Sequence, residues 1–265
     1  MIAVSDGQSP DDATPGSGAC VLGPIDDETA HRRGAALAHA LAATRGTDLL
    51  VGDASTSPET AASTPLPDSH REAHCSPTTR LSVGDTLQPV VEGHQPSGIV
   101  LERDGSSFLE GLRADPAERL AAEADVLTVD GRGDAEPIAS MLVPVAGGHH
   151  SQLAAEAAYA LAVANDAAVD LFHVIESDTD EVRARGQEIL DGVRASLEDA
   201  DRVDTWLFEA ENTAEAIIEQ STYYDLTVMG APTVGPLERF VFGSLSKRVQ
   251  QGAESPVIVA HAHQP

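Results

Sequence analysis

Short apolar runs alternate with longer amphipathic segments along the second half of the chain, and this alternation constrains the fold more than any other feature. The first amphipathic segment carries Leu153, Ala157 and Leu161 at helical spacing, which predicts a helix with one apolar face. The expected strands lie at 140–148, 169–176, 203–210, 225–230 and 255–261, and the expected helices at 149–166, 180–200, 212–224 and 244–253. Strands that are apolar across their whole width and separated by helices predict an α/β fold, a mainly parallel five-stranded open sheet with helices on both faces.

The first half of the chain repeats the same order more faintly, so we interpret the chain as an internal duplication of two tandem domains. Pro24 follows its strand as Pro144 does in the second half. The predicted parts are a flexible acidic tail at 1–17, a degenerate N-terminal domain at 18–132 and a C-terminal domain at 137–262. A segment at 55–79, rich in Pro, Ser and Thr, is expected to replace the second helix of the copy by a loop.

The charge of the chain excludes some classes of partner. Its 43 acidic residues outnumber the 16 basic ones, the formal net charge is −27, and Lys247 is the sole lysine. Such a surface repels nucleic acids and anionic membranes, and it is typical of adaptation to a salt-rich cytoplasm, where screening makes the charge tolerable. The 2 cysteines show no disulfide or metal-binding spacing, and no apolar run approaches the ~20 residues of a membrane helix. We therefore expect a cytoplasmic protein without nucleic-acid partners or membrane insertion.

The segment after the fourth strand carries the residues best suited to a ligand. Gly230 ends that strand, and Gly243 with Ser244 is expected to open the next helix. In an open parallel sheet, ligands bind beyond the carboxyl ends of the strands. Glycines let the backbone approach a ligand closely, and the free N–H groups of a helix's first turn suit a phosphate. The spacing alone favours phosphate binding and simple helix capping by Ser244 equally.

This segment resembles the universal stress protein (UspA) family. Its nucleotide-binding members have Met-Gly at a strand end, a second glycine after two residues, and Gly-Ser or Gly-Thr after nine more. The residues that keep this spacing are Met229, Gly230, Gly243 and Ser244, with Thr233 at the second glycine. MLVPVAGG at 141–148 looks like the family's first strand, and ESPVIVAH at 254–261 looks like the closing strand that mediates dimer contacts. The resemblance covers residues 137–262 and is to tandem-domain members such as those of extreme halophiles.

The resemblance implies a fold like that of the adenine nucleotide alpha hydrolases and ATP as the ligand, with Mg²⁺ accompanying it. Adenine would lie beside Pro144 and Val145, with backbone contacts from Val174. The residues implied around the ribose and phosphates are Met229, Gly230, Gly243, Ser244 and Leu245. In the loop between them, Gly235 adds backbone freedom and the hydroxyl of Thr233 is a further phosphate donor.

Several positions depart from the family's pattern. Ala146 stands where the family has an acidic residue after the first strand, which removes a polar contact to the nucleotide. The Cβ of Thr233 restricts the loop. In the first half, Glu102 and Asp115 occupy the positions that match the loop glycine and serine. Because carboxylates repel a phosphate, we expect no ATP site in the N-terminal domain.

Other polar residues indicate no catalytic or metal site. His149 and His150 follow the first strand, and we interpret them as surface histidines because no carboxylate-rich metal motif accompanies them. His261 and His263 are interpreted as parts of a strand end and a frayed terminus. We therefore predict a binding or regulatory protein rather than an enzyme, with slow ATP hydrolysis as the least supported alternative.

The predicted function is adenine-nucleotide sensing in a stress response, with ATP in the C-terminal domain and the N-terminal domain as a scaffold. We expect the domains to pack as an intramolecular pseudo-dimer in which 125–130 pairs with 256–261, and association of two chains into a homodimer stays open. The alternative is a nucleotide-independent regulatory partner of a membrane transporter or signalling protein, acting through its surfaces.

Overall fold

The fold is known from a computed structural model. It describes residues 20–22, 28–53, 78–82, 91–92, 95–103, 117, 120–130, 137–197, 201–232 and 239–263. The predicted acidic tail at 1–17 and most of the predicted loop at 55–79 lie outside these residues.

The second half of the chain alternates between strands and helices, as predicted, and one helix is described among the strands of the first half. The elements of the first half are β1 (Cys20–Leu22), α1 (Glu28–Arg45), β2 (Leu49–Asp53), β3 (Thr78–Ser82), β4 (Gly98–Arg103) and β5 (Asp125–Asp130). Those of the second half are β6 (Ser140–Pro144), α4 (Gly148–Asn165), β7 (Ala168–Ile175), α5 (Asp180–Arg194), β8 (Val203–Glu209), α6 (Thr213–Ser221), β9 (Leu226–Gly230), α7 (Arg239–Gly252) and β10 (Val257–His261). The five strands expected in the second half are all confirmed.

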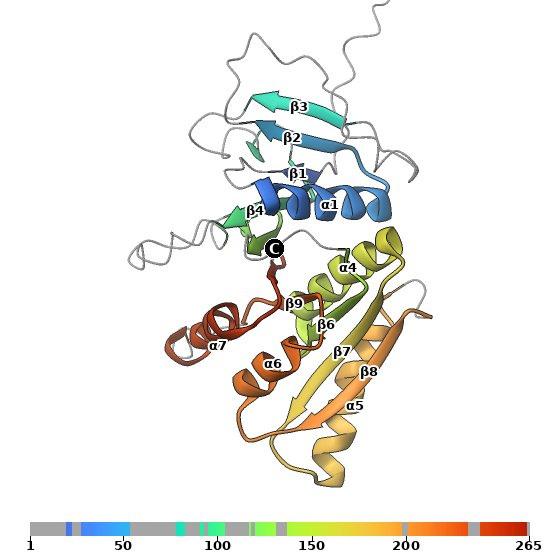
Figure 1. The fold of residues 1–265 in the computed structure, drawn as a ribbon, viewed down its shortest axis with the longest axis vertical. Helices are drawn as coiled ribbons and strands as arrows, with labels where there is room; N and C mark the ends of the chain where they lie inside the picture. Colours follow the sequence, from blue (N-terminus) through green and yellow to red (C-terminus); the bar gives the residue numbers. More distant parts are fainter. Residues whose placement is uncertain are drawn as a thin grey trace, which may run out of the picture.

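The ten strands of the described residues form a single sheet, in the order β3-β2-β1-β4-β5-β10-β9-β6-β7-β8 (Figure 1). Every pair is parallel except β5 with β10, which run antiparallel with Val126 opposite His261 and Val129 opposite Ile258. The predicted pairing of 125–130 with 256–261 is therefore confirmed. Outward from this junction, each half places its strands in the same order: fifth, fourth, first, second and third.

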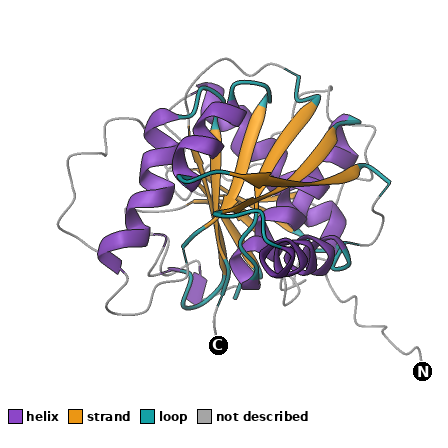
Figure 2. Cartoon of the chain, turned by 90° about the horizontal axis from the view of Figure 1, so that it is seen from below, coloured by secondary structure: helices purple, strands orange, loops and turns teal. Residues whose placement is uncertain are grey.

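Helices lie on both faces of the sheet (Figure 2), and local sequence explains where they begin. Thr179 caps α5 by accepting from the Val182 N–H at 3.3 Å. Asn212 caps α6 by accepting from the N–H groups of Ala214 and Glu215. The prediction that Gly243 opens the last helix is wrong, because α7 begins at Arg239. The residues RFVF contain no helix-breaking residue and extend the helix toward its N-terminus.

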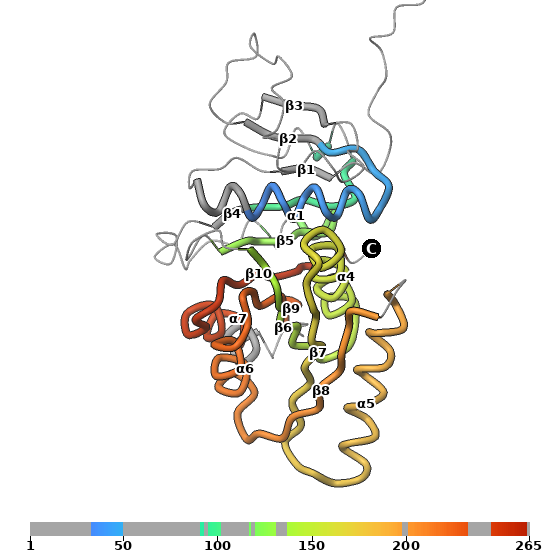
Figure 3. Tube along the Cα trace, turned by 45° about the vertical axis from the view of Figure 1, so that its right-hand side comes forward, coloured from blue at the N-terminus to red at the C-terminus, as the bar shows by residue number. Residues whose placement is uncertain are grey.

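One hydrophobic core spans both halves. It contains Leu37 and Leu41 of α1, Leu127 of β5, and Ala157 and Leu161 of α4, all almost completely buried. Helices α1 and α4 pack against each other on one face of the sheet, where α1 contacts β5 and α4 contacts β10 (Figure 3). The small side chains of α4 let this helix approach its neighbours closely, so the two halves share one packed layer.

Helices α1 and α4 are equivalent position by position, with each residue of α1 matching the residue 120 positions later. Both helices contain 18 residues. Each is followed by a residue in the left-handed region, Gly46 with φ 62° and Asp166 with φ 56°. The next N–H closes the same turn in both, from Thr47 to the Ala42 carbonyl at 2.9 Å, and from Ala167 to the Ala162 carbonyl at 3.0 Å.

Candidate functional site

The candidate site lies at the carboxyl ends of β6, β7 and β9. From β6 the chain runs outward to β7 and β8, and it then returns to place β9 on the other side of β6. Strand order reverses at this point, and the crevice beyond such a reversal is where open α/β sheets bind ligands. The predicted residues Pro144, Val145 and Gly230 lie at these strand ends.

The loop from β6 to α4 is held by three hydrogen bonds. The Val145 N–H donates to the Phe172 carbonyl at 2.9 Å. The Ala146 N–H donates to the Ser151 hydroxyl at 3.0 Å. The His173 Nδ1 lies 2.7 Å from the Val145 carbonyl oxygen, and because a carbonyl only accepts, Nδ1 carries the proton. The loop is therefore fixed on β7 and on the first turn of α4.

The N-terminus of α4 differs from those of α5 and α6. Gly147 and Gly148 have φ of 85° and 77°, which favours glycine, and they turn the chain sharply from the loop into the helix. No side chain caps the helix, and its first turn has no acidic residue. In contrast, α5 and α6 have both a side-chain cap and acidic residues in the first turn. The positive end of the α4 dipole is thus not offset by a carboxylate of its own first turn.

Gly230 is required by packing at this site. A Cβ at this position would lie 2.7 Å from the His150 carbonyl carbon and 2.8 Å from its oxygen. The end of β9 therefore touches the backbone of the first turn of α4, and any other residue would push the two apart. The spacing motif marked Gly230 as a place of close approach, and the backbone of α4 is what it approaches.

The other predicted site residues lie in different environments. Met229 is buried in the core formed with Phe172 and Leu142, and Val174 and Leu245 are half-buried against the same core. Gly243 and Ser244 lie inside α7, one turn past its start, so the N–H groups of its first turn precede them. Thr233 and Gly235 lie outside the described residues. The structure therefore brings together the predicted residues at the ends of β6, β7 and β9, whereas Gly243 and Ser244 lie within a helix.

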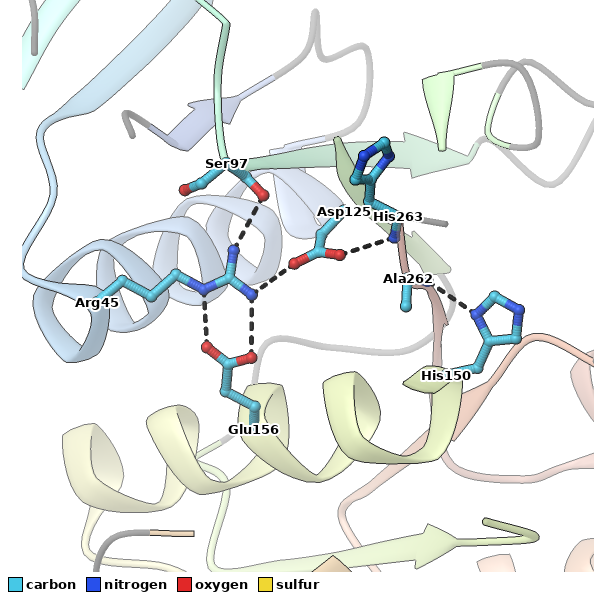
Figure 4. Close-up of polar contacts among 7 residues, drawn as sticks. All are labelled: Arg45, Ser97, Asp125, His150, Glu156, Ala262 and His263. Atoms are coloured by element: carbon cyan, nitrogen blue, oxygen red, sulfur yellow. Dashed lines mark hydrogen bonds and ion pairs between the residues drawn. The ribbon is translucent and has the colours of Figure 1, made fainter. Parts of the chain in front are cut away.

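His150 and the last described residues are docked, which corrects two predictions. The Ala262 N–H donates to His150 Nδ1 at 2.8 Å, and the His263 N–H donates to an Asp125 carboxylate oxygen at 2.8 Å (Figure 4). His150 is half-buried rather than a surface histidine, and the chain up to His263 is not frayed. Burial, then the charge of His149, lower the pKa of His150, while Asp125 opposes this shift.

A charged cluster that the sequence did not reveal joins the two halves beside these contacts. Arg45, at the end of α1, holds both carboxylate oxygens of Glu156 on α4, at 2.7 and 3.0 Å. It also donates to Asp125 at 2.8 Å and to the Ser97 carbonyl at 3.1 Å. We call Arg45, Ser97, Asp125 and Glu156 the Arg45 cluster; Figure 4 shows them around one guanidinium. The single carboxylate within the alanine-rich face of α4 was the signal that could have indicated it.

Burial by itself would lower the pKa of Arg45, but hydrogen bonds and charge from Glu156, and then from Asp125, outweigh it and raise this pKa. Among the described residues, no three His, Cys, Asp or Glu side chains are grouped so that they could hold a metal ion. The helices in this part of the chain also include none with the length and apolar character needed to cross a membrane.

An open parallel α/β domain with a glycine-rich turn at the strand reversal defines a class of ligand-binding domains. Residues 138–261 match the model of the Universal stress protein family. The matched residues are nearly those of the resemblance, 137–262.

Solved structures share the fold over both halves. A universal stress protein from Archaeoglobus fulgidus is 17% identical with a TM-score of 0.57, over 92% of this chain and 97% of its own. A putative universal stress protein from Pseudomonas aeruginosa is 19% identical with a TM-score of 0.57, over 92% of each chain. The cytoplasmic domain of a prokaryotic cation chloride cotransporter is 12% identical with a TM-score of 0.62, over 93% of this chain and 96% of its own. No curated protein matches the sequence.

Proposed function

We propose that this chain is a regulatory protein that binds an adenine nucleotide, ATP in the first place, through its C-terminal half. In this proposal the protein responds to the nucleotide and does not turn it over as an enzyme. The base lies near Pro144, Val145 and Val174, and the phosphates face the loops that follow β6 and β9. The match of residues 138–261 to the family supports the choice of this half.

The observation that carries the proposal is the N-terminus of α4. It follows two left-handed glycines, lacks a side-chain cap and has no carboxylate in its first turn. It also lies at the strand reversal, beside Gly230. The N–H groups of a helix's first turn and the positive end of its dipole suit an anionic phosphate, whereas the capped and acidic starts of α5 and α6 do not.

The test is titration calorimetry of the full chain with MgATP in concentrated KCl, which screens the net charge of −27. We expect stoichiometric binding, and we expect His149→Asp to weaken it about tenfold by placing a carboxylate in the first turn of α4. The same substitution favours the helix dipole, so stability should not fall. Val163→Asp, at the exposed far end of the same helix, is the matched control and should leave the affinity unchanged.

Two results would contradict this function. One is that the chain binds no ATP at millimolar concentration. The other is that His149→Asp and Val163→Asp alter the affinity equally. Phosphate release at the background rate is expected in parallel, because the described residues offer no base beside a metal-binding carboxylate group.

We further propose that the chain is a tandem duplication packed as an intramolecular pseudo-dimer, with the N-terminal half as a scaffold. The mirrored strand order about the β5–β10 junction and the constant offset between α1 and α4 support this. Binding of one ATP per chain in the same titration is expected, because Glu102 replaces the strand-end glycine in the first half. Two equivalent sites per chain would disprove the scaffold role.

A second candidate is a nucleotide-independent regulator of a membrane transporter. It is favoured by one observation: the fold of this chain matches that of the cytoplasmic domain of a cation chloride cotransporter over 93% of the chain. Co-purification with a transporter from membrane extract in concentrated KCl, unchanged by ATP and by His149→Asp, would support this candidate over nucleotide sensing.

A further inference from the structure

Among the described residues, the Arg45 cluster is a densely connected charged group between the two halves. Its arginine comes from α1, one carboxylate from β5, and the other from α4 across the junction. The side chains of Arg45, Asp125 and Glu156 are only 15%, 23% and 34% exposed, respectively. Bidentate pairing of an arginine with a carboxylate fixes direction as well as distance, so the cluster sets how α1 lies against α4.

The cluster occurs on one side of the junction only. The offset of 120 positions makes Asn165 the counterpart of Arg45 and Ala36 the counterpart of Glu156. The Asn165 side chain donates within its own helix, to the Leu161 carbonyl at 2.8 Å. Ala36 has no charge to offer a partner. A twofold arrangement of identical halves would contain two copies of the cluster or none.

The same asymmetry affects the free energy of pairing if the C-terminal half of a second chain took the place of the N-terminal half at the junction. Such a copy would bring its Asn165 toward Glu156 in place of Arg45. Glu156, whose side chain is 34% exposed, would then face the junction without a cation, which disfavours such a pairing. An N-terminal half satisfies Glu156 and keeps Asp125 in the same network.

We propose that the junction face of the C-terminal half, β10 with α4, is specific for an N-terminal half through the Arg45 cluster and rejects a second C-terminal half. The inference rests on the proposed tandem arrangement and is independent of nucleotide binding. Failure of the ATP titration would therefore leave it intact.

The test is a double-mutant cycle in the full chain, Arg45→Glu, Glu156→Arg and both together, unfolded by urea in concentrated KCl. Trp206 is the sole tryptophan and reports the C-terminal half by its fluorescence. Each single reversal sets like charges together and is expected to raise the unfolding equilibrium constant at least about tenfold. The double reversal restores opposite charges and should recover most of this loss. Additive effects of the two reversals would overturn the proposal.

If a charge reversal unfolds the chain, hydrogen exchange of the milder variant Arg45→Gln tests the same proposal. Faster exchange is expected at Asp125–Asp130 and Val257–His261 with little change in β7. Uniform acceleration in all strands would show a general loss of stability and contradict a role at the junction. The matched control is the exposed pair of Arg183 with Asp178, 2.6 Å apart, whose reversal should leave exchange at the junction unchanged.

Sedimentation of the unchanged chain tests the choice of partner directly. We expect the mass of one chain, because its own N-terminal half already occupies the face. A dimer whose formation slows exchange at Val257–His261 would show that this edge accepts a second C-terminal half, and it would overturn the proposal.

Discussion

Helices α1 and α4 occupy the same place in the two halves, and their differences are more instructive than their likeness. They share length, a left-handed C-terminal residue and the hydrogen bond that follows it. These shared features connect a helix to the next parallel strand. The two helices differ at their charged positions, where α1 ends in Arg45 and α4 carries Glu156 but ends in Asn165. The two helices therefore share the features that their C-terminal turns require. They differ in the charged side chains that face the junction.

The first turns sharpen the comparison further. In α4, the first turn touches Gly230, and His150 receives the Ala262 N–H. The residue that matches Gly230 in the first half is Glu102, which cannot provide a contact that excludes a Cβ. The start of α4 is therefore fixed by its own half through a glycine that the sequence of the first half lacks.

The largest expected effect comes from Gly230→Val, which places a branched side chain against the His150 backbone. We expect a loss of about 3 kcal/mol or more in the free energy of unfolding, because backbone cannot move aside as a side chain can. Urea unfolding followed by Trp206 fluorescence measures it. Gly192→Ala is the control, since it has open space around it and should be neutral or slightly stabilising. Equal effects of the two changes would contradict the close contact.

The next largest effect is the difference in stability between two substitutions at equivalent helix ends, Arg45→Ala in α1 and Asn165→Ala in α4. Removing Arg45 leaves Asp125 and Glu156 without their cation, and we expect a loss of about 2 kcal/mol. Removing Asn165 breaks one bond within the exposed end of α4, so a change within about 0.5 kcal/mol is expected. Thermal or urea unfolding of both variants compares the halves directly. Similar losses would mean that the ends are equivalent after all.

A smaller effect should depend on pH. His150 accepts a hydrogen bond through Nδ1 in its neutral form, and burial, then the charge of His149, lower its pKa below the unfolded value of 6.5. The unfolded chain then binds more protons, so stability contributed by neutral His150 is complete above pH 6.5 and is lost as the pH falls below it. Urea unfolding across this range should show a shallower slope in His150→Gln. An unchanged slope would indicate that other groups control the dependence.

The smallest expected effect is a gain in stability at the junction. Thr128 of β5 is buried, and within the described part of the chain its hydroxyl has no hydrogen-bond partner. Thr128→Val keeps the shape and removes the unsatisfied group, so we expect an increase of up to about 1 kcal/mol. Differential scanning calorimetry is the suitable measurement. A decrease would imply that the hydroxyl is satisfied in solution.

The alternation of apolar runs and amphipathic segments was sufficient to predict the second half of the fold. It located the five strands there, and the pairing of 125–130 with 256–261 followed from the closing dimer strand that the family resemblance implies, applied to a duplicated chain. The start of α7 was missed because glycine was given more weight than the helix-compatible residues before it. Gly230 was marked as a place of close approach, and the structure shows the backbone of His150 against it.

The Arg45 cluster and the docking of His150 were beyond sequence pattern alone. Their members come from positions 45, 97, 125, 150, 156 and 262–263, which no local spacing connects. They meet only because the two halves close on each other at an antiparallel junction. Contacts of this kind depend on the relative placement of large units, whereas strand and helix patterns depend on neighbours in sequence.

The position of β10 has a consequence for biosynthesis. Of the ten strands it is translated last, yet it lies in the middle of the sheet, between β5 and β9. While the chain is being made, β5 and β9 each present an open strand edge, the kind of surface that pairs with other nascent chains. The sheet is sealed only when residues 257–261 have left the ribosome, so the vulnerable period of this protein lasts until β10 emerges.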